Sequence, residues 1–81
     1  MKLTEGNNIT IGFVLINTMP EHEHKVYNSL INESKVLEIR PLYKEYDLLA
    51  KIKTSNKQKF GDFLSDKIRS LEGVIDTKTI Q

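Results

Sequence analysis

Residues 10–17 constrain the fold most strongly, because apolar side chains fill both alternating sets of positions in this segment. The β-branched and aromatic content of the segment predicts a strand. One set comprises Ile11, Phe13 and Leu15, and the other comprises Val14 and Ile16. A strand of this composition needs apolar cover on both faces of its sheet.

Alternating apolar residues predict two further strands at residues 36–43 and 46–53. Only Lys44 and Glu45 separate them, so we expect an antiparallel hairpin with a tight connection. Pro41 has no backbone N–H to donate to a ladder, which favours an edge position for the first strand of this pair.

Thr18 and Glu21 have the spacing of a capping box and predict the start of a helix that ends at Asn32. Its apolar residues recur at helical spacing as one stripe of Val26, Tyr27, Leu30 and Ile31. Because the stripe is one-sided, this helix can cover only one face of a sheet.

A second capping box, formed by Ser55 and Gln58, predicts a second helix that also carries one apolar stripe. The stripe consists of Phe60, Phe63, Leu64, Ile68 and Leu71. Gly73 follows as a predicted left-handed C-cap. A last strand is predicted over residues 74–80, with Ile75, Thr77 and Thr79 on one face.

The predicted order is that of a ferredoxin-like β-α-β-β-α-β sandwich in the α+β class, with a four-stranded antiparallel sheet and two helices on one face. We expect one domain over residues 9–81, after a flexible leader at residues 1–8. Four strands about 4.8 Å apart and about 17 Å long would leave roughly 330 Å² of sheet uncovered. Another copy of the chain is the simplest cover for an apolar patch of this size.

Composition argues against several classes of function. The formal net charge is +1, which gives no strong attraction to nucleic acid. The chain has no cysteine, which excludes disulfides, thiolate metal sites and a cysteine nucleophile. A signal peptide, a membrane span, a nucleophile signature and a phosphate-binding loop are not recognisable either. We therefore expect a cytoplasmic protein that is not an enzyme and uses no cofactor.

His22 and His24 alternate with Glu21 and Glu23 at the start of the first predicted helix. Residues two apart on a helix point in different directions, so this cluster fails the geometry of a metal site. A solvated helix start is the favoured interpretation.

Two stretches resemble the effector domain of the Lrp/AsnC family. Residues 39–51 (IRPLYKEYDLLAK) are similar to that domain's hairpin, in which an acidic residue, an aromatic, an aspartate and aliphatic residues follow the turn. Residues 67–79 (KIRSLEGVIDTKT) are similar to its closing segment, with a glycine–valine corner and two threonines on the last strand. The resemblance extends over residues 11–80 at matching spacing.

The resemblance implies dimers formed through the sheets, often built up to an octameric ring, with small ligands, typically amino acids, held between dimers. In that scheme Glu45 and Asp47 meet the ligand's amino group, and backbone amides at Lys44 and Glu45 face its carboxylate. Thr77 and Thr79 of a neighbouring dimer close the cleft. We expect the subunit interface to include Phe13, Leu15, Tyr43, Tyr46 and Leu49.

Members of this family usually carry an N-terminal helix-turn-helix for DNA binding. The chain resembles the stand-alone, sensor-only branch, which is familiar mostly from archaea and bacteria. This implies a module that senses an amino acid or related metabolite and regulates transcription indirectly. It would act through its own assembly or by pairing with full-length Lrp/AsnC regulators, without contacting nucleic acid or a membrane.

Two positions depart from the family pattern. Lys44 replaces the turn glycine, and Glu21 replaces the glycine after the proline that precedes the first helix. Glycine permits positive φ and close approach of a ligand to the backbone. Three consequences of Lys44 are open: a strained turn, a shielded pocket, or an added cation for an anionic ligand.

Two alternative functions share this element order. An RNA-recognition domain places stacking aromatics on its central strands, where the third strand here offers Leu48, Ala50, Lys51 and Ile52. A dimeric α/β-barrel enzyme of the small-monooxygenase type needs polar groups facing a cavity between sheet and helices, whereas both helix stripes here are apolar. An RNA titration and a turnover screen would distinguish these alternatives from the sensor.

Overall fold

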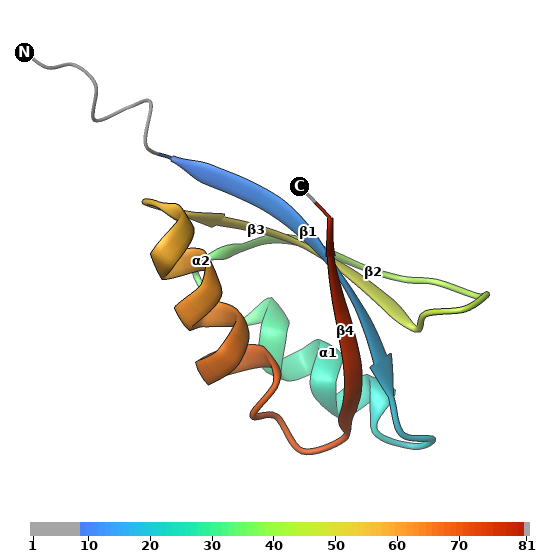
Figure 1. Ribbon diagram of the computed structural model, residues 1–81. Coiled ribbons are helices and arrows are strands. Elements are labelled where there is room, and N and C mark those ends of the chain that lie inside the picture. The colour runs from blue at the N-terminus through green and yellow to red at the C-terminus, as the bar shows by residue number, and fades with distance from the viewer. Residues whose placement is uncertain (1–8, 81) are drawn as a thin grey trace, which may run out of the picture.

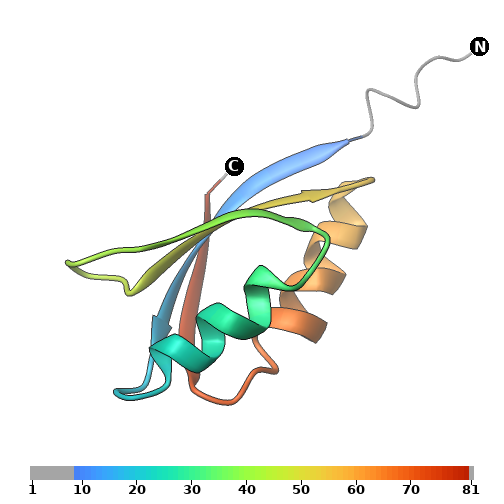
Figure 2. The same cartoon turned by 180° about the vertical axis from the view of Figure 1, so that it is seen from behind.

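The computed structural model describes residues 9–80, so the predicted leader at residues 1–8 lies outside the described part of the chain. The element order matches the prediction, except that a π-helical turn, η2, continues the second helix. The elements are β1 (Thr10–Thr18), α1 (Glu23–Ile31), β2 (Val36–Pro41), β3 (Leu48–Thr54), α2 (Lys57–Phe63), η2 (Leu64–Ile68) and β4 (Val74–Ile80). Both helices lie on one side of the sheet (Figure 1 and Figure 2).

The four strands follow the order β2-β3-β1-β4, and every neighbouring pair is antiparallel. β1 and β3 are therefore the central strands, which agrees with the two-sided apolar composition of β1. The register pairs Leu15 with Leu49 and Lys78, and Val14 with Ala50. Directly opposed residues share a face. The row through Val14 is buried under the helices, and the row through Leu15 belongs to the opposite side, which we call the open face.

The core fills the space between the sheet and the helices. It consists of Val14, Ile16, Val26, Leu30, Ile39, Leu48, Ala50, Ile52, Phe60, Phe63 and Ile68, all of which are buried. The predicted helix stripes thus supply nearly half of the core, although Ile31, at the end of α1, is 50% exposed. Packed side chains therefore fill the space between sheet and helices, where an α/β-barrel enzyme of the small-monooxygenase type would need a cavity.

The predicted capping box at the start of α1 was wrong. Thr18 is the last residue of β1, and its hydroxyl donates to Asp47 instead of capping a helix. α1 begins at Glu23 after His22, which makes no side-chain cap bond. The turn between β1 and α1 puts Glu21 at a φ of 75°, in the left-handed region that favours glycine.

The second helix begins one residue later than predicted and ends differently. Asn56, rather than Ser55, is the N-cap, and its side-chain oxygen accepts a hydrogen bond of 2.8 Å from the backbone N–H of Lys59. In η2 the backbone N–H of Arg69 donates to the carbonyl oxygen of Leu64 at 2.9 Å. A π turn is one residue longer than an α turn, and apolar spacing did not distinguish the two.

Gly73 has the predicted left-handed backbone, with a φ of 99°, but it is not the C-cap, because η2 ends at Ile68 and its C-cap is Arg69. A Cβ at this position would lie 2.5 Å from Cβ of His22. The carbonyl oxygen of Gly73 accepts a hydrogen bond of 2.8 Å from the backbone N–H of Met19. The corner between η2 and β4 is therefore pressed against the turn that leads into α1.

Candidate functional site

The connection between β2 and β3 is longer than the predicted turn. β2 ends at Pro41 and β3 begins at Leu48, so residues 42–47 form what we call the hairpin loop. Tyr43 and Tyr46, which were predicted in strands, belong to this loop instead. The loop projects beyond the rest of the sheet (Figure 1 and Figure 2).

Asp47 ties the hairpin loop to the end of β1. Its backbone N–H donates to the carbonyl oxygen of Ile16 at 2.9 Å, and its own carbonyl oxygen accepts from Leu42 at 2.7 Å. Its side-chain Oδ2 accepts from the backbone N–H of Thr18 at 2.7 Å and from the Thr18 hydroxyl at 3.2 Å. Thr18 is buried, so its N–H needs this partner.

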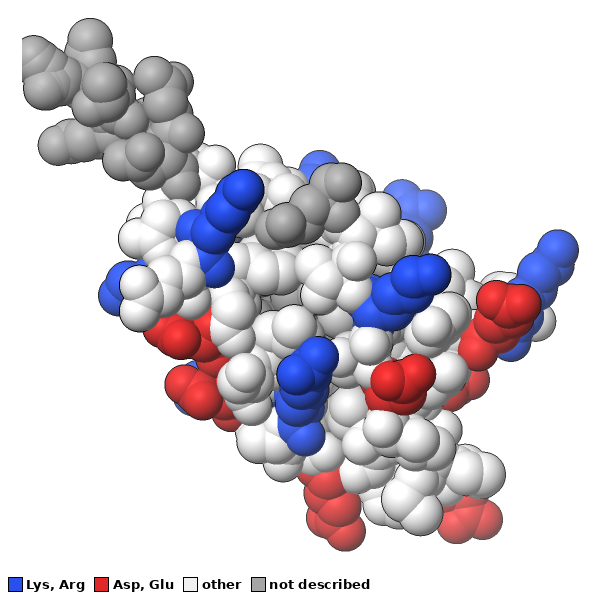
Figure 3. Space-filling model, viewed as in Figure 1, with Lys and Arg blue, Asp and Glu red and all other residues white. Residues whose placement is uncertain are grey.

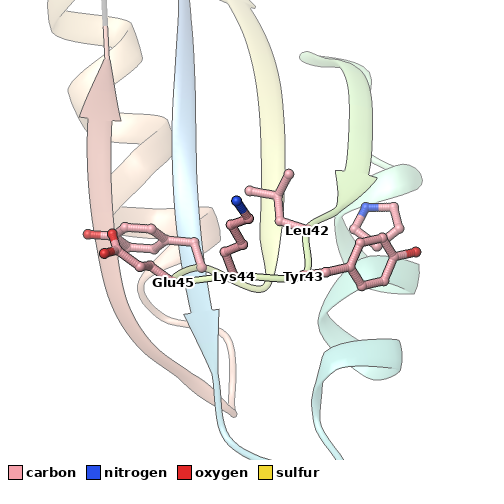
Figure 4. Close-up of a pocket in the computed structure, with 6 residues that line it drawn as sticks. Leu42, Tyr43, Lys44 and Glu45 are labelled. Carbon is pink, nitrogen blue, oxygen red and sulfur yellow. The ribbon is translucent and has the colours of Figure 1, made fainter.

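A hollow of about 510 Å³ lies at the hairpin loop. Its lining residues are Pro41, Leu42, Tyr43, Lys44, Glu45 and Tyr46. Tyr43 and Glu45 project to opposite sides of the loop, and Lys44 extends between them beside Leu42 (Figure 4). The structure therefore brings the predicted ligand residues Lys44 and Glu45 together, while Asp47 is not among the lining residues.

Lys44 does not strain the turn. Among the non-glycine residues that the structure describes, only Glu21 has a positive φ. Lys44 and Glu45 are both exposed, and within residues 9–80 neither forms an ion pair. The loop therefore presents one available cation and one available carboxylate.

Thr77 and Thr79 lie on β4, at the sheet edge opposite β2. The register aligns one row across all four strands, namely Pro41, Leu48, Ile16 and Thr77. At about 4.8 Å per strand, the row places Thr77 about 14 Å from the edge that carries the hairpin loop. The threonines and the hairpin loop therefore do not form one site within a single subunit.

Arg69 is a residue that the sequence analysis missed. Its Nε donates a hydrogen bond of 3.1 Å to the Thr77 hydroxyl oxygen. A hollow of about 200 Å³ is lined by Arg69, Val74, Ile75, Asp76 and Thr77. In the sequence Arg69 is one more charged residue near a helix end, and no motif marks its approach to β4.

Three residues of the predicted interface lie together on the open face. They are Phe13, Leu15 and Leu49. Phe13 is 38% exposed, and Nζ of Lys51 lies 5.9 Å from the centre of its ring. The two tyrosines of the predicted interface belong to the hairpin loop, where Tyr43 is 89% exposed. The open face therefore carries an apolar group formed by Phe13, Leu15 and Leu49.

A small charged cluster joins α1 to the corner before β4. Nζ of Lys25 lies 3.1 Å from Glu72, and Nε2 of His22 lies 3.9 Å from the same carboxylate. The hydrogen bond and charge of Lys25, followed by the charge of His22, lower the pKa of Glu72. Within the described residues, no group of three or more potential metal ligands occurs.

Charges of both signs are interspersed on the side of the molecule that Figure 3 presents, without a large area of one sign. None of the helices in residues 9–80 has the length and apolar character to cross a membrane. The side shown in Figure 3 therefore carries no extended basic surface of the kind that binds a nucleic-acid backbone.

The pattern of the Lrp/AsnC ligand binding domain matches residues 11–80, which is nearly the whole chain. The chain belongs to this family. The HTH-type transcriptional regulator FL11 of Pyrococcus furiosus is 32% identical over 75 residues, covering 93% of this chain and 48% of that protein. This Lrp/AsnC chain thus spans about half the length of the curated relatives it matches.

Solved structures of the family confirm the ferredoxin-like fold. FFRP-DM1 is 30% identical with a TM-score of 0.84, and the match covers 86% of this chain and 93% of that chain. A protein of Thermus thermophilus is 27% identical with a TM-score of 0.82, covering 86% of this chain and 88% of its own. A transcriptional regulator of Neisseria meningitidis, solved with L-methionine, shares the fold at 21% identity, with a TM-score of 0.81 and coverage of 98% and 53%.

Proposed function

We propose that this Lrp/AsnC domain binds an amino-acid-like effector at the hairpin loop and thereby contributes to transcriptional regulation. The hollow of about 510 Å³ beside Lys44 and Glu45 is the observation that carries the proposal. Its volume suits a small metabolite. In this arrangement Glu45 meets the effector's ammonium group, and the backbone amides at Lys44 and Glu45 face its carboxylate. Asp47 contributes by fixing the loop, since its Oδ2 is already bonded to Thr18.

The effector site is completed by association of subunits. Dimers form through the open face, where Phe13, Leu15 and Leu49 are flanked by Ile11 and Ile80, which are 47% and 46% exposed. A second copy removes this apolar surface from water. Assembly of dimers into a ring then brings Thr77 and Thr79 of one dimer to the hairpin loop of the next. The distance between these elements within one subunit supports this division of the site.

Regulation requires the effector to bind one assembly more tightly than another. The relative from Neisseria meningitidis that was solved with L-methionine makes amino acids the first compounds to test. Full-length Lrp/AsnC regulators are the proposed partners, because the curated relatives are HTH-type transcriptional regulators.

The proposal is tested by thermal-shift screening of all common amino acids, with light scattering on the same samples. At least one amino acid is expected to raise Tm by several degrees at saturation. Glu45→Gln should abolish the shift, whereas Asp62→Asn, at an exposed carboxylate on α2, should leave it unchanged. If no amino acid raises the Tm of the protein or changes the mass of its assembly in solution, the proposed function is overturned.

A further inference from the structure

Arg69 and Thr77 form a corner beside β4 that is rich in hydrogen-bond donors. The Nε–H of Arg69 is used on the Thr77 hydroxyl oxygen, which leaves the N–H groups of its two terminal nitrogens available. Within residues 9–80, no carboxylate forms an ion pair with Arg69. The Thr77 hydroxyl accepts this bond and still has its own hydrogen to donate. The corner is therefore complementary to an anion.

The backbone holds this corner from both sides. The N–H of Arg69 is bonded to Leu64 in η2, which fixes where the side chain leaves the helix end. On β4, a bulge leaves Ile75 without a partner, since Asn17 pairs with Asp76 and Thr18 pairs with Val74. Bulges redirect the side chains around them and recur beside functional sites. The guanidinium is thus positioned without any ligand.

Asp76 lines the same hollow, but it does not neutralise the corner. Successive strand residues point to opposite faces. Thr77 pairs with buried Ile16 on the helix side, whereas Asp76 pairs with Asn17 on the open-face side. An anion that approaches from the helix side of β4 therefore meets Arg69 and Thr77 first.

We propose that this corner binds the distal carboxylate of the effector, so that the ligand is an acidic amino acid or a similar dicarboxylate. The inference rests on the proposed function, in which the hairpin loop takes the α-amino and α-carboxylate groups. Thr77 of the neighbouring dimer then contacts the far end of the ligand, together with Arg69 of the same subunit. The planar guanidinium fork matches a carboxylate with two parallel hydrogen bonds.

Calorimetric titrations with glutamate and aspartate, each compared with its neutral amide, glutamine or asparagine, test this assignment. The acids are expected to bind about 10- to 100-fold more tightly than the amides. Arg69→Met should remove this preference. Lys67→Met, at an exposed lysine two residues before Arg69, should keep the preference.

Two variants separate the positioning of Arg69 from its charge. Arg69→Lys retains the cation but lacks the fork, and Thr77→Val removes the hydroxyl that accepts from Nε. Each is expected to reduce the preference in part. The Nε–H resonance of Arg69 should also shift with glutamate and stay in place with glutamine.

Equal affinity for acid and amide overturns this inference, as does a preference that survives Arg69→Met. In both cases neutral or acidic amino acids still bind, and the proposed function stands. Failure of every amino acid to bind the wild-type protein overturns both the proposed function and the inference. Circular dichroism of each variant checks that the fold is intact.

Discussion

Oδ2 of Asp47 lies 2.7 Å from the backbone nitrogen of Thr18 and accepts its hydrogen bond. The two residues are 29 positions apart, so the bond joins the hairpin loop to the end of β1. The capping-box spacing assigned Thr18 to a helix cap, and the family resemblance placed Asp47 at the ligand's amino group. The contact shows that Thr18 instead helps to fix the loop that carries Lys44 and Glu45, while the ligand role of Asp47 stays a prediction.

Asp47→Ala is expected to destabilise the fold by about 2 kcal/mol, because it removes a charged acceptor and leaves a buried N–H without a partner. Thr18→Val removes only the hydroxyl bond of 3.2 Å and should cost about 1 kcal/mol or less. Urea unfolding of both variants provides the comparison. If both variants lose the same free energy of unfolding, the bond from the Thr18 N–H to Asp47 is not the source of the stabilisation.

Glu21→Gly is expected to stabilise the protein by up to about 1 kcal/mol. A non-glycine residue in the left-handed region lowers the stability of the fold by about 1–2 kcal/mol. The glycine relieves this strain, but the greater backbone entropy that it loses on folding offsets part of the gain. The φ of 75° at Glu21 is the source of this cost. Glu23→Gly, in the first turn of α1, is the matched control and should destabilise by about 1 kcal/mol. A loss of stability in Glu21→Gly would contradict the argument.

Gly73→Ala is expected to destabilise by at least about 2 kcal/mol, since a Cβ is disfavoured at this φ and collides with His22. Gly61→Ala is expected to change stability in the opposite direction. A Cβ at Gly61 would meet no atom within 4 Å, and the residue lies inside α2, so a gain of about 0.5–1 kcal/mol is expected. Thermal unfolding of the two variants measures both effects, and similar changes in Tm would contradict them.

The lowered pKa of Glu72 predicts how stability changes with acid. Because the folded pKa lies below the ordinary value of 4.5, the stabilising contribution is present above 4.5 and is lost as pH falls through the folded value. Glu72 is exposed, so salt should weaken the effect. Unfolding free energies of wild type and Glu72→Gln should therefore differ at neutral pH and converge in acid. A difference that does not depend on pH would contradict this account.

The fold was largely predictable from the sequence, because the apolar period changes wherever an element changes. Residues 10–17 were recognisable as a strand that is covered on both faces, since both alternating sets are apolar. The boundaries were less predictable. The π turn before Arg69 depends on a backbone hydrogen bond, and the cap at Asn56 depends on a bond from a backbone N–H to its side-chain oxygen. Apolar spacing encodes neither bond.

The candidate site was predictable only in part. The resemblance to the Lrp/AsnC domain pointed to Lys44 and Glu45, which share one loop because they are adjacent in the chain. The contact between Arg69 and Thr77 required the register of β4 and the end of η2 to be known. The hairpin connection was predicted too short, because the apolar alternation through Tyr43 and Tyr46 did not mark the ends of β2 at Pro41 and of β3 at Leu48.

Sedimentation velocity over a dilution series tests most directly whether a second copy covers the open face. The account predicts a wild-type particle of at least twice the 9.4 kDa subunit mass at micromolar concentration. Phe13→Glu should give a folded monomer, whereas Ile31→Glu, at an exposed apolar residue of α1 on the helix side, should leave the assembly unchanged. A wild-type protein that stays folded and monomeric throughout the series would contradict it.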